Sequence, residues 1–181
     1  MKPVKKILAL ILAGVMALAL LTGCGKAASL NRTVAEGLAE YTKLTLAQAG
    51  NDKNISVSYQ VPELGRNIAP LFDENWITKD NGDDVLNENY KVNGNKTVKE
   101  TLTDILSPYI SAGSAVNFVA ADVTDVKTPF IEGTNLIDSE ITFDENTQSI
   151  APASVTSLKI AVTHKTVNGR TYALTVIIYE A

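Results

Sequence analysis

Cysteine and histidine are almost absent from this chain, with one of each among its 181 residues. A disulfide framework needs cysteines in pairs, so a disulfide-stabilised domain is excluded. A zinc site draws on several His or Cys ligands, which the chain does not have. His164 could serve a nucleophilic triad, but no Gly-x-Ser-x-Gly segment supplies a serine for it. We therefore predict no catalytic residue of these classes, no metal site and no cofactor.

Segments that bind phosphate are also missing. Gly65, Gly82 and Gly94 stand alone, without the spacing of a phosphate-binding loop. The 20 acidic residues leave the carboxylate chemistry of a glycosidase open, because some two acids will always lie close together. The sequence does not select such a pair. A carboxylate-based hydrolase is therefore the enzymatic alternative, and its residues cannot be named.

The N-terminus has the three parts of a secretory signal. Residues 1–6 carry three lysines and no acid, residues 7–21 form an unbroken apolar run, and small residues follow at 22 and 23. The run is short for a membrane span, which needs about 20 apolar residues. We predict that this segment is a signal helix that directs export and is then cleaved.

The signal ends in Leu21-Thr22-Gly23-Cys24, which resembles the lipobox of bacterial lipoproteins. In that family the cysteine thiol receives a diacylglycerol, and a dedicated signal peptidase cuts just before the cysteine. The resemblance implies a lipid on Cys24 and recognition of Leu21, Thr22 and Gly23 by the peptidase. Two acyl chains hold a protein stably on a membrane without a transmembrane helix. The alternative is an ordinary export signal, or a signal anchor, in which Cys24 occurs by chance.

Cleavage at this point divides the chain into a signal peptide at 1–23, a lipidated cysteine with a short tether at 24–30, and a single domain at 31–181. It removes three of the 16 basic residues and none of the 20 acids, so 13 basic residues remain and the side-chain balance becomes −7. This acidity argues against a nucleic-acid partner and against electrostatic binding to anionic lipid. The tether reaches less than about 30 Å even when extended, so we expect the domain to lie close to the membrane.

Helix signals mark two main places in the domain. Thr33–Glu36 and Thr97–Glu100 both have the spacing of a capping box, and apolar residues follow each at helical spacing. We expect a first helix that begins near residue 33 and is ended by the glycine at 50, and a second helix over 97–107. A shorter helix is expected at 70–76.

Strand signals dominate the second half of the chain, while the polar stretch at 78–95 is expected to be a long loop. Alternating apolar and polar residues predict strands at 55–61, 115–126, 141–143, 155–166 and 171–179. Helices early and strands late favour an α+β domain. We predict an antiparallel sheet with two or three helices packed on one face.

Two registers compete for the hairpin formed by the last two strands, which flank Val167-Asn168-Gly169-Arg170. A two-residue type I′ turn would pair Val167 with Arg170. A three-residue loop would pair Thr166 with Arg170 and align the apolar residues of both strands on one face. Because register normally follows the apolar face, we favour the three-residue loop, with Gly169 in a left-handed bulge.

Three further features bear on function. Asp80–Asp84, with Glu88 nearby, is the densest group of oxygen ligands, but acids are missing at the EF-hand positions before Gly82. A solvated polar loop is therefore favoured over a calcium site. We expect His164 to be structural. We expect Trp76 to lie in the core, the alternative being a surface platform that stacks on sugar or peptide.

The sequence thus predicts a lipid-anchored lipoprotein on the extracytoplasmic face of a bacterial membrane, acting as a non-catalytic binding or accessory module of the cell envelope. Its expected partners are the membrane, through the lipid on Cys24, and an envelope protein or glycan. The polar loop at 78–95 is the expected contact surface, because long loops in compact domains are often functional. The alternative is the carboxylate-based hydrolase, acting on glycan or peptidoglycan. A solute receptor is a third hypothesis, disfavoured because one domain lacks the usual two lobes.

Overall fold

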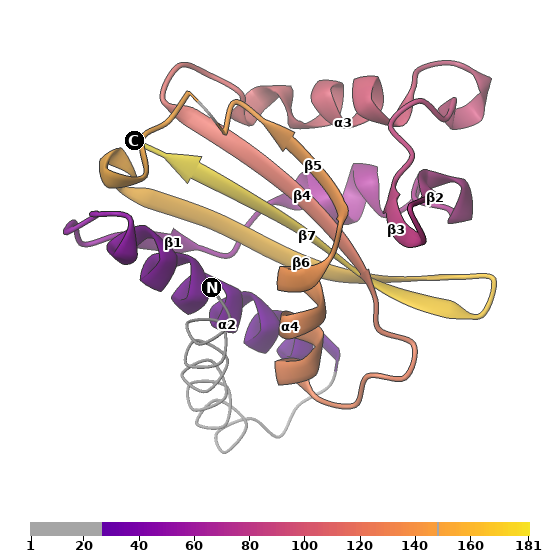
Figure 1. The fold of residues 1–181 in the computed structure, drawn as a ribbon, viewed down its shortest axis with the longest axis horizontal. Coiled ribbons are helices and arrows are strands. Elements are labelled where there is room, and N and C mark those ends of the chain that lie inside the picture. The colour runs from indigo at the N-terminus through magenta and orange to yellow at the C-terminus, as the bar shows by residue number, and fades with distance from the viewer. Residues whose placement is uncertain (1–26, 148) are drawn as a thin grey trace.

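A five-stranded sheet with strand order β1-β6-β7-β4-β5 forms the centre of the domain (Figure 1). The computed structural model describes residues 27–147 and 149–181. The strands of the sheet are β1 (Ser56–Ser58), β4 (Ser114–Asp122), β5 (Ile141–Glu145), β6 (Ser157–Val167) and β7 (Arg170–Glu180). The main helices are α2 (Ala27–Gln48), α3 (Val98–Leu106) and α4 (Pro129–Asp138). The predicted α+β class is confirmed, while the predicted signal helix lies outside the described residues.

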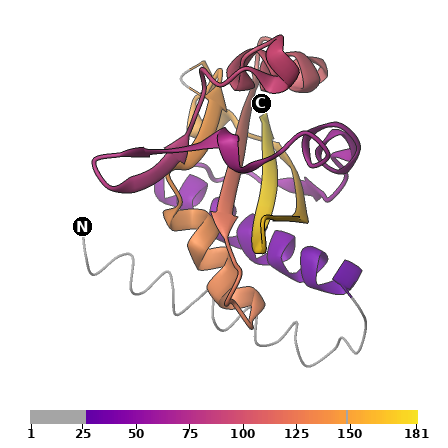
Figure 2. The same ribbon diagram turned by 90° about the vertical axis from the view of Figure 1, so that its right-hand side faces the viewer.

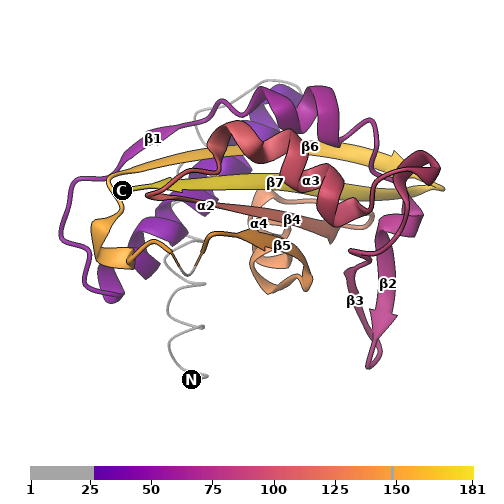
Figure 3. The same ribbon diagram turned by 90° about the horizontal axis from the view of Figure 1, so that it is seen from above.

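Helices cover both sides of the sheet. α2 and α4 pack on one side, which we call the α2 face, and α3 packs on the other together with the short helix η1 (Leu64–Ile68); we call that side the α3 face (Figure 3). The prediction of two helices on one face holds for α2 and α4, but α3 lies opposite them. The reason is that the central strands β4 and β7 are apolar on both faces, so each face needs a cover.

The sheet is antiparallel except at one edge, where β1 runs parallel to β6. The prediction of an antiparallel sheet therefore fails for β1. Antiparallel pairing is required only when a tight turn joins two strands, whereas a parallel pair needs a long connection. Ser56 pairs with Ser157, so about a hundred residues separate these two strands along the chain.

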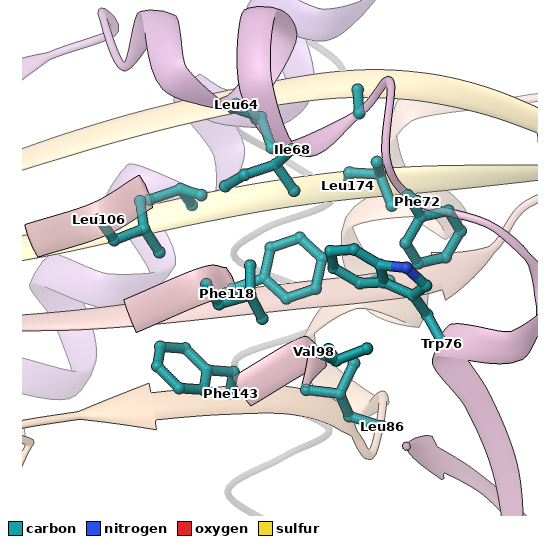
Figure 4. Packing of buried hydrophobic residues seen from close by; sticks show 14 of the residues in the cluster. Leu64, Ile68, Phe72, Trp76, Leu86, Val98, Leu106, Phe118, Phe143 and Leu174 are labelled. Atoms are coloured by element: carbon teal, nitrogen blue, oxygen red, sulfur yellow. The ribbon is translucent and has the colours of Figure 1, made fainter. Parts of the chain in front are cut away.

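Aromatic rings fill the α3 face. Trp76 is fully buried, and its ring centroid lies 5.6 Å from that of Phe72 and 6.4 Å from that of Phe118. Figure 4 shows these rings between the sheet and the chain that leads to α3. The predicted core position of Trp76 is confirmed. Its indole Nε1 has no hydrogen-bond partner among the described residues.

The two capping-box signatures have different outcomes. Thr97 begins α3 with a true box, in which its hydroxyl accepts from the N–H of Glu100 at 3.1 Å. α2, in contrast, begins at Ala27, so the predicted start near Thr33 is wrong. Glu36 pairs instead with Arg32 one turn earlier, at 2.7 Å. Good helix formers upstream, including the alanine at 27, extend the helix past the signature.

The C-terminal hairpin has the two-residue turn. Val167 pairs with Arg170, and both Asn168 (φ 49°) and Gly169 (φ 80°) are left-handed, as a type I′ turn requires. The favoured three-residue register is therefore wrong. Residues 172–178 of β7 are all buried, so neither face of that strand is the solvent face and apolar matching does not fix the register.

Candidate functional site

Two adjoining hollows lie between the helices and the sheet on the α2 face. The first has a volume of about 240 Å³ and lies between α2, α4 and strands β4, β5 and β7. The second, of about 190 Å³, lies between the end of α2, β4 and the chain that follows β5. Asn117 and Tyr179 line both hollows, and we call the pair of hollows the α2–α4 groove.

The groove exists because the side chains on this face are small. Every buried member of the hydrophobic cluster described here is aliphatic, without a Phe or Trp ring. α2 contributes Leu38 and, one turn later, Tyr41 and Thr42 to the wall, and α4 contributes Leu136 and Ile137. A large ring in place of Leu38, Thr42 or Leu136 would fill the space, as rings do on the α3 face.

Thr175 of β7 is the most informative residue of the groove. Its side chain lines the first hollow and is 1 % exposed, yet its Oγ1 has no hydrogen-bond partner among the described residues. Leaving a buried hydroxyl unpaired costs about 1–3 kcal/mol. An occupant of the groove that hydrogen-bonds to Thr175 would recover that free energy.

Two further polar groups stand where the hollows meet. Burial raises the pKa of the Tyr179 phenol to about 12, with smaller contributions from Asp144 and Tyr41. The phenol is protonated at neutral pH and can donate a hydrogen bond. Asn117 donates a hydrogen bond from Nδ2 to Asp144 Oδ1. Among the described residues that line the groove, Asp144 is the only charged one. This lining suits a neutral or cationic molecule and disfavours an anion.

A buried contact between Glu132 and His164 lies beside the two helices that wall the groove. The Glu132 side chain of α4 is 4 % exposed, and its Oε1 lies 3.0 Å from His164 Nε2 of β6. Glu132 Oε1 forms no hydrogen bond with another described residue. His164 Nδ1 lies 2.7 Å from Oδ1 of Asn31 in α2. His164 therefore bridges three elements, which is a structural position.

A third hollow, of about 350 Å³ and separate from the groove, is lined mainly by acids. It collects acidic residues from β3 (Asp83–Leu86), the end of β4, α4 and the start of β5, namely Asp83, Asp84, Asp122, Asp138 and Glu140. A glycosidase needs one carboxyl that burial keeps protonated. Asp84 and Asp122 are instead 43 % and 40 % exposed and lie beside Lys79 and Arg170. This hollow therefore does not favour the hydrolase hypothesis.

The Asp80–Asp84 segment is the turn of a separate hairpin. β2 (Ile77–Asp80) pairs with β3, and the hairpin projects from the domain (Figure 2). The predicted loop at 78–95 is thus partly wrong, and Asn81-Gly82, a type I′ dipeptide, was the available signal. Glu88 pairs with Lys99 at 3.1 Å rather than joining this segment. The described residues include no group of three or more His, Cys, Asp or Glu placed to hold a metal ion.

The site residues predicted from the sequence, Leu21, Thr22, Gly23 and Cys24, lie outside the described residues. The first described helix begins at Ala27, within the stretch predicted as tether. Within the described ranges, no helix has both the length and the apolar character needed to cross a bilayer. The groove residues were missed because they come from five elements that lie far apart in the sequence. Their one local signal is Thr175, a polar residue within the apolar strand β7.

Comparison of the chain with protein-family models, with curated proteins and with solved structures finds no match. Function is therefore inferred from the groove and from the chain's own residues.

Proposed function

We propose that this protein is a lipid-anchored lipoprotein of the bacterial cell envelope, and that it acts as a non-catalytic binding module whose ligand occupies the α2–α4 groove. The export signal and the Leu21-Thr22-Gly23-Cys24 segment support the anchor. Ala27, the first described residue, is already helical and follows Cys24 by three positions, so a lipid on Cys24 would hold this residue within roughly 10 Å of the lipid attachment point.

The unpartnered hydroxyl of Thr175 is the observation that carries the binding proposal. Small-molecule sites are mostly apolar hollows in which a few polar groups fix the orientation of the ligand. The α2–α4 groove has this character, with Thr175, Asn117 and Tyr179 as its polar groups. The ligand class that fits is a small, largely apolar, neutral or cationic molecule that can hydrogen-bond.

A neutral fluorescent probe tests the groove. N-phenyl-1-naphthylamine is apolar, carries one N–H and brightens when it leaves water. We expect it to bind detergent-solubilised full-length protein. Ile137→Trp, which fills the first hollow, should weaken binding by about tenfold or more, and Thr175→Val should weaken it by about threefold.

Thr101→Val is the matched control, because Thr101 is a buried threonine of α3 on the opposite side of the sheet. It should leave the affinity for the probe unchanged. Equal affinity in wild type, Ile137→Trp and Thr175→Val would show that the probe binds elsewhere and would contradict the proposed site.

The lipid anchor is tested separately. Radiolabelled palmitate fed to a bacterium that expresses the protein should enter the wild-type chain. The Cys24→Ala variant should carry no label and should remain at precursor size on a gel. Label retained in Cys24→Ala would refute the anchor, without bearing on the groove.

The polar segment at 78–95 is proposed as the contact for an envelope protein or glycan. The projection of the β2–β3 hairpin from the domain supports this (Figure 2). Deletion of the hairpin from folded protein should reduce the recovery of a cross-linked envelope partner, whereas unchanged recovery would count against the assignment.

A further inference from the structure

The outer edge of β6 is open over most of its length. β1 pairs only with Ser157–Lys159, whereas β6 continues to Val167. Figures 1 and 3 show β1 beside the first part of β6 alone. The segment from Ile160 to Thr166 therefore has β7 on one side and no strand on the other.

The register tells which backbone groups point outward. In a hairpin closed by a two-residue turn, the closing pair exchanges both hydrogen bonds, and alternate residues then face the partner strand. With Val167 and Arg170 as the closing pair, the N–H and C=O groups of Val162, His164 and Thr166 point away from β7. Within 27–147 and 149–181, no hydrogen bond to these outward groups is formed.

A hollow of about 460 Å³ lies beside this edge. One wall is β6 at Ala161, Val162 and Thr163, and the other is the chain at 59–66, which diverges from β6 after β1 ends. The divergence leaves space where a further strand would lie about 4.8 Å from β6.

The one charged side chain among the described residues that line this hollow is basic, although the chain as a whole is acidic. Arg66 lines the hollow and is exposed, and Lys165 follows Thr163 on the same face of β6. Neither side chain forms an ion pair with another described residue. A second copy of this chain placed edge to edge would bring the same cations together, which is unfavourable. An acidic occupant would neutralise them.

We propose that the β6 edge between Ile160 and Thr166 binds an extended acidic peptide segment of a partner protein as an added strand. The peptide backbone would pair with the outward groups of Val162, His164 and Thr166. Its carboxylates would meet Arg66 and Lys165. This proposal is independent of both the groove and the lipid anchor.

The opposite edge of the sheet provides an internal reference. β5 carries acids at Asp144 and Glu145, follows Glu140, and is bridged at its start by Val85. Charges on an edge strand discourage pairing with further strands, and negative charges repel an acidic peptide. The two edges should therefore differ sharply in what they bind.

The test uses detergent-solubilised, isotope-labelled full-length protein and two synthetic peptides, one of alternating Glu and Val and one of alternating Lys and Val. We expect the Glu–Val peptide to bind, and to slow hydrogen exchange at the amides of Val162, His164 and Thr166 but not at β5. The Lys–Val peptide should bind at least about tenfold more weakly.

Charge reversal provides the matched variant. Arg66 and Lys165 are not part of the core, so the double variant R66E/K165E should fold and should prefer the Lys–Val peptide. A Val162→Pro variant removes one outward donor without removing a β6–β7 hydrogen bond, and it should weaken binding by about three- to tenfold. Protection of β5 instead of β6, equal binding of both peptides, or a dimer that protects Val162 without peptide would each overturn the proposal.

Discussion

The two faces of the central sheet are built on different principles. On the α3 face, Trp76, Phe72, Phe118 and Phe143 are at most 1 % exposed, and their rings fill the space between sheet and cover. The α2 face is aliphatic and leaves the α2–α4 groove open. It also holds the buried contact between Glu132 and His164 and the unpartnered hydroxyl of Thr175, which lines a hollow, whereas the unpartnered indole Nε1 of Trp76 on the α3 face is enclosed among packed rings.

The contrast indicates that one face contributes chiefly to stability and the other is available for ligand binding. Close packing of large rings contributes most of the free energy that a small core can supply. Polar groups with incomplete partners are tolerated where a function compensates for them. The α3 face thus stabilises the domain, and the α2 face is the side on which to look for a ligand.

The largest expected effect tests this division with two neighbouring residues of β4. Phe118 points to the α3 face and Val119 to the α2–α4 groove. Phe118→Ala should lower the free energy of unfolding by about 3–5 kcal/mol. Val119→Ala should lower it by only about 1–2 kcal/mol, because it removes less apolar surface beside an existing hollow. Urea unfolding measures both, and similar losses would break the comparison.

The next effect concerns the contact between Glu132 and His164 on the α2 face. His164→Ala leaves Glu132 buried without its partner, and should lower the free energy of unfolding by about 2–3 kcal/mol. This is less than for a fully buried pair, because the imidazole is 25 % exposed. Adding Glu132→Gln should restore part of the loss, since an amide is easier to bury than a charge. A double variant less stable than His164→Ala would contradict this account.

A smaller effect, of opposite sign, is expected at Thr175. Thr175→Val removes the unpartnered hydroxyl and should raise the free energy of unfolding by about 1 kcal/mol in the absence of ligand. Thr42→Val is the control on the same groove, because the Thr42 hydroxyl donates to the carbonyl of Leu38 at 2.8 Å. The unfolding temperatures of both variants test this prediction. Stabilisation by Thr42→Val but not by Thr175→Val would contradict the conclusion that the Thr175 hydroxyl is the one without a partner.

The smallest effect at neutral pH comes from one tyrosine on each side of the sheet. The pKa values of Tyr179 and Tyr109 are raised from 10.0 to about 12, in both cases chiefly by burial, and for Tyr109 also by its hydrogen bond to Glu63. The folded state keeps these protons longer than the unfolded chain. Their contribution to stability is therefore complete below pH 10 and is lost as the pH rises towards 12.

Ultraviolet titration of tyrosinate measures this directly. Tyr179→Phe and Tyr109→Phe should each remove one late-ionising phenol. Glu63→Gln should lower the pKa of Tyr109 and leave that of Tyr179 unchanged. A shift of both tyrosines in Glu63→Gln would mean that the two sides are electrostatically coupled.

The sequence predicted correctly those structural features that depend only on neighbouring residues. The capping box at Thr97 and the glycine that ends α2, Gly50 with φ 92°, follow from local backbone needs. The same box at Thr33 failed because the residues that precede it extend the helix towards the N-terminus. The hairpin register failed because an apolar pattern carries no information about register in a strand buried on both faces, whereas the Asn168-Gly169 turn did carry it.

The groove was beyond prediction for a different reason. Its polar groups lie close together only because β4 and β7 are neighbours in the sheet; they are Asn117, Thr175 and Tyr179. Local sequence patterns do not specify the order of strands in a sheet. The side of the sheet on which α3 packs could not be predicted either. An amphipathic pattern shows that a helix has a buried side, but it does not show which face of the sheet that side contacts.

The strand order also has a consequence for how the chain assembles during synthesis. β6 and β7 are the last elements to be made, yet they occupy central positions, and β1 and β4 pair directly with them. α2 and β1 are made early and find their partner β6 only across a separation of about a hundred residues. The domain therefore cannot close from its N-terminus onward. Its early apolar segments stay exposed until the final hairpin arrives, and that is the interval in which the chain is most prone to aggregate.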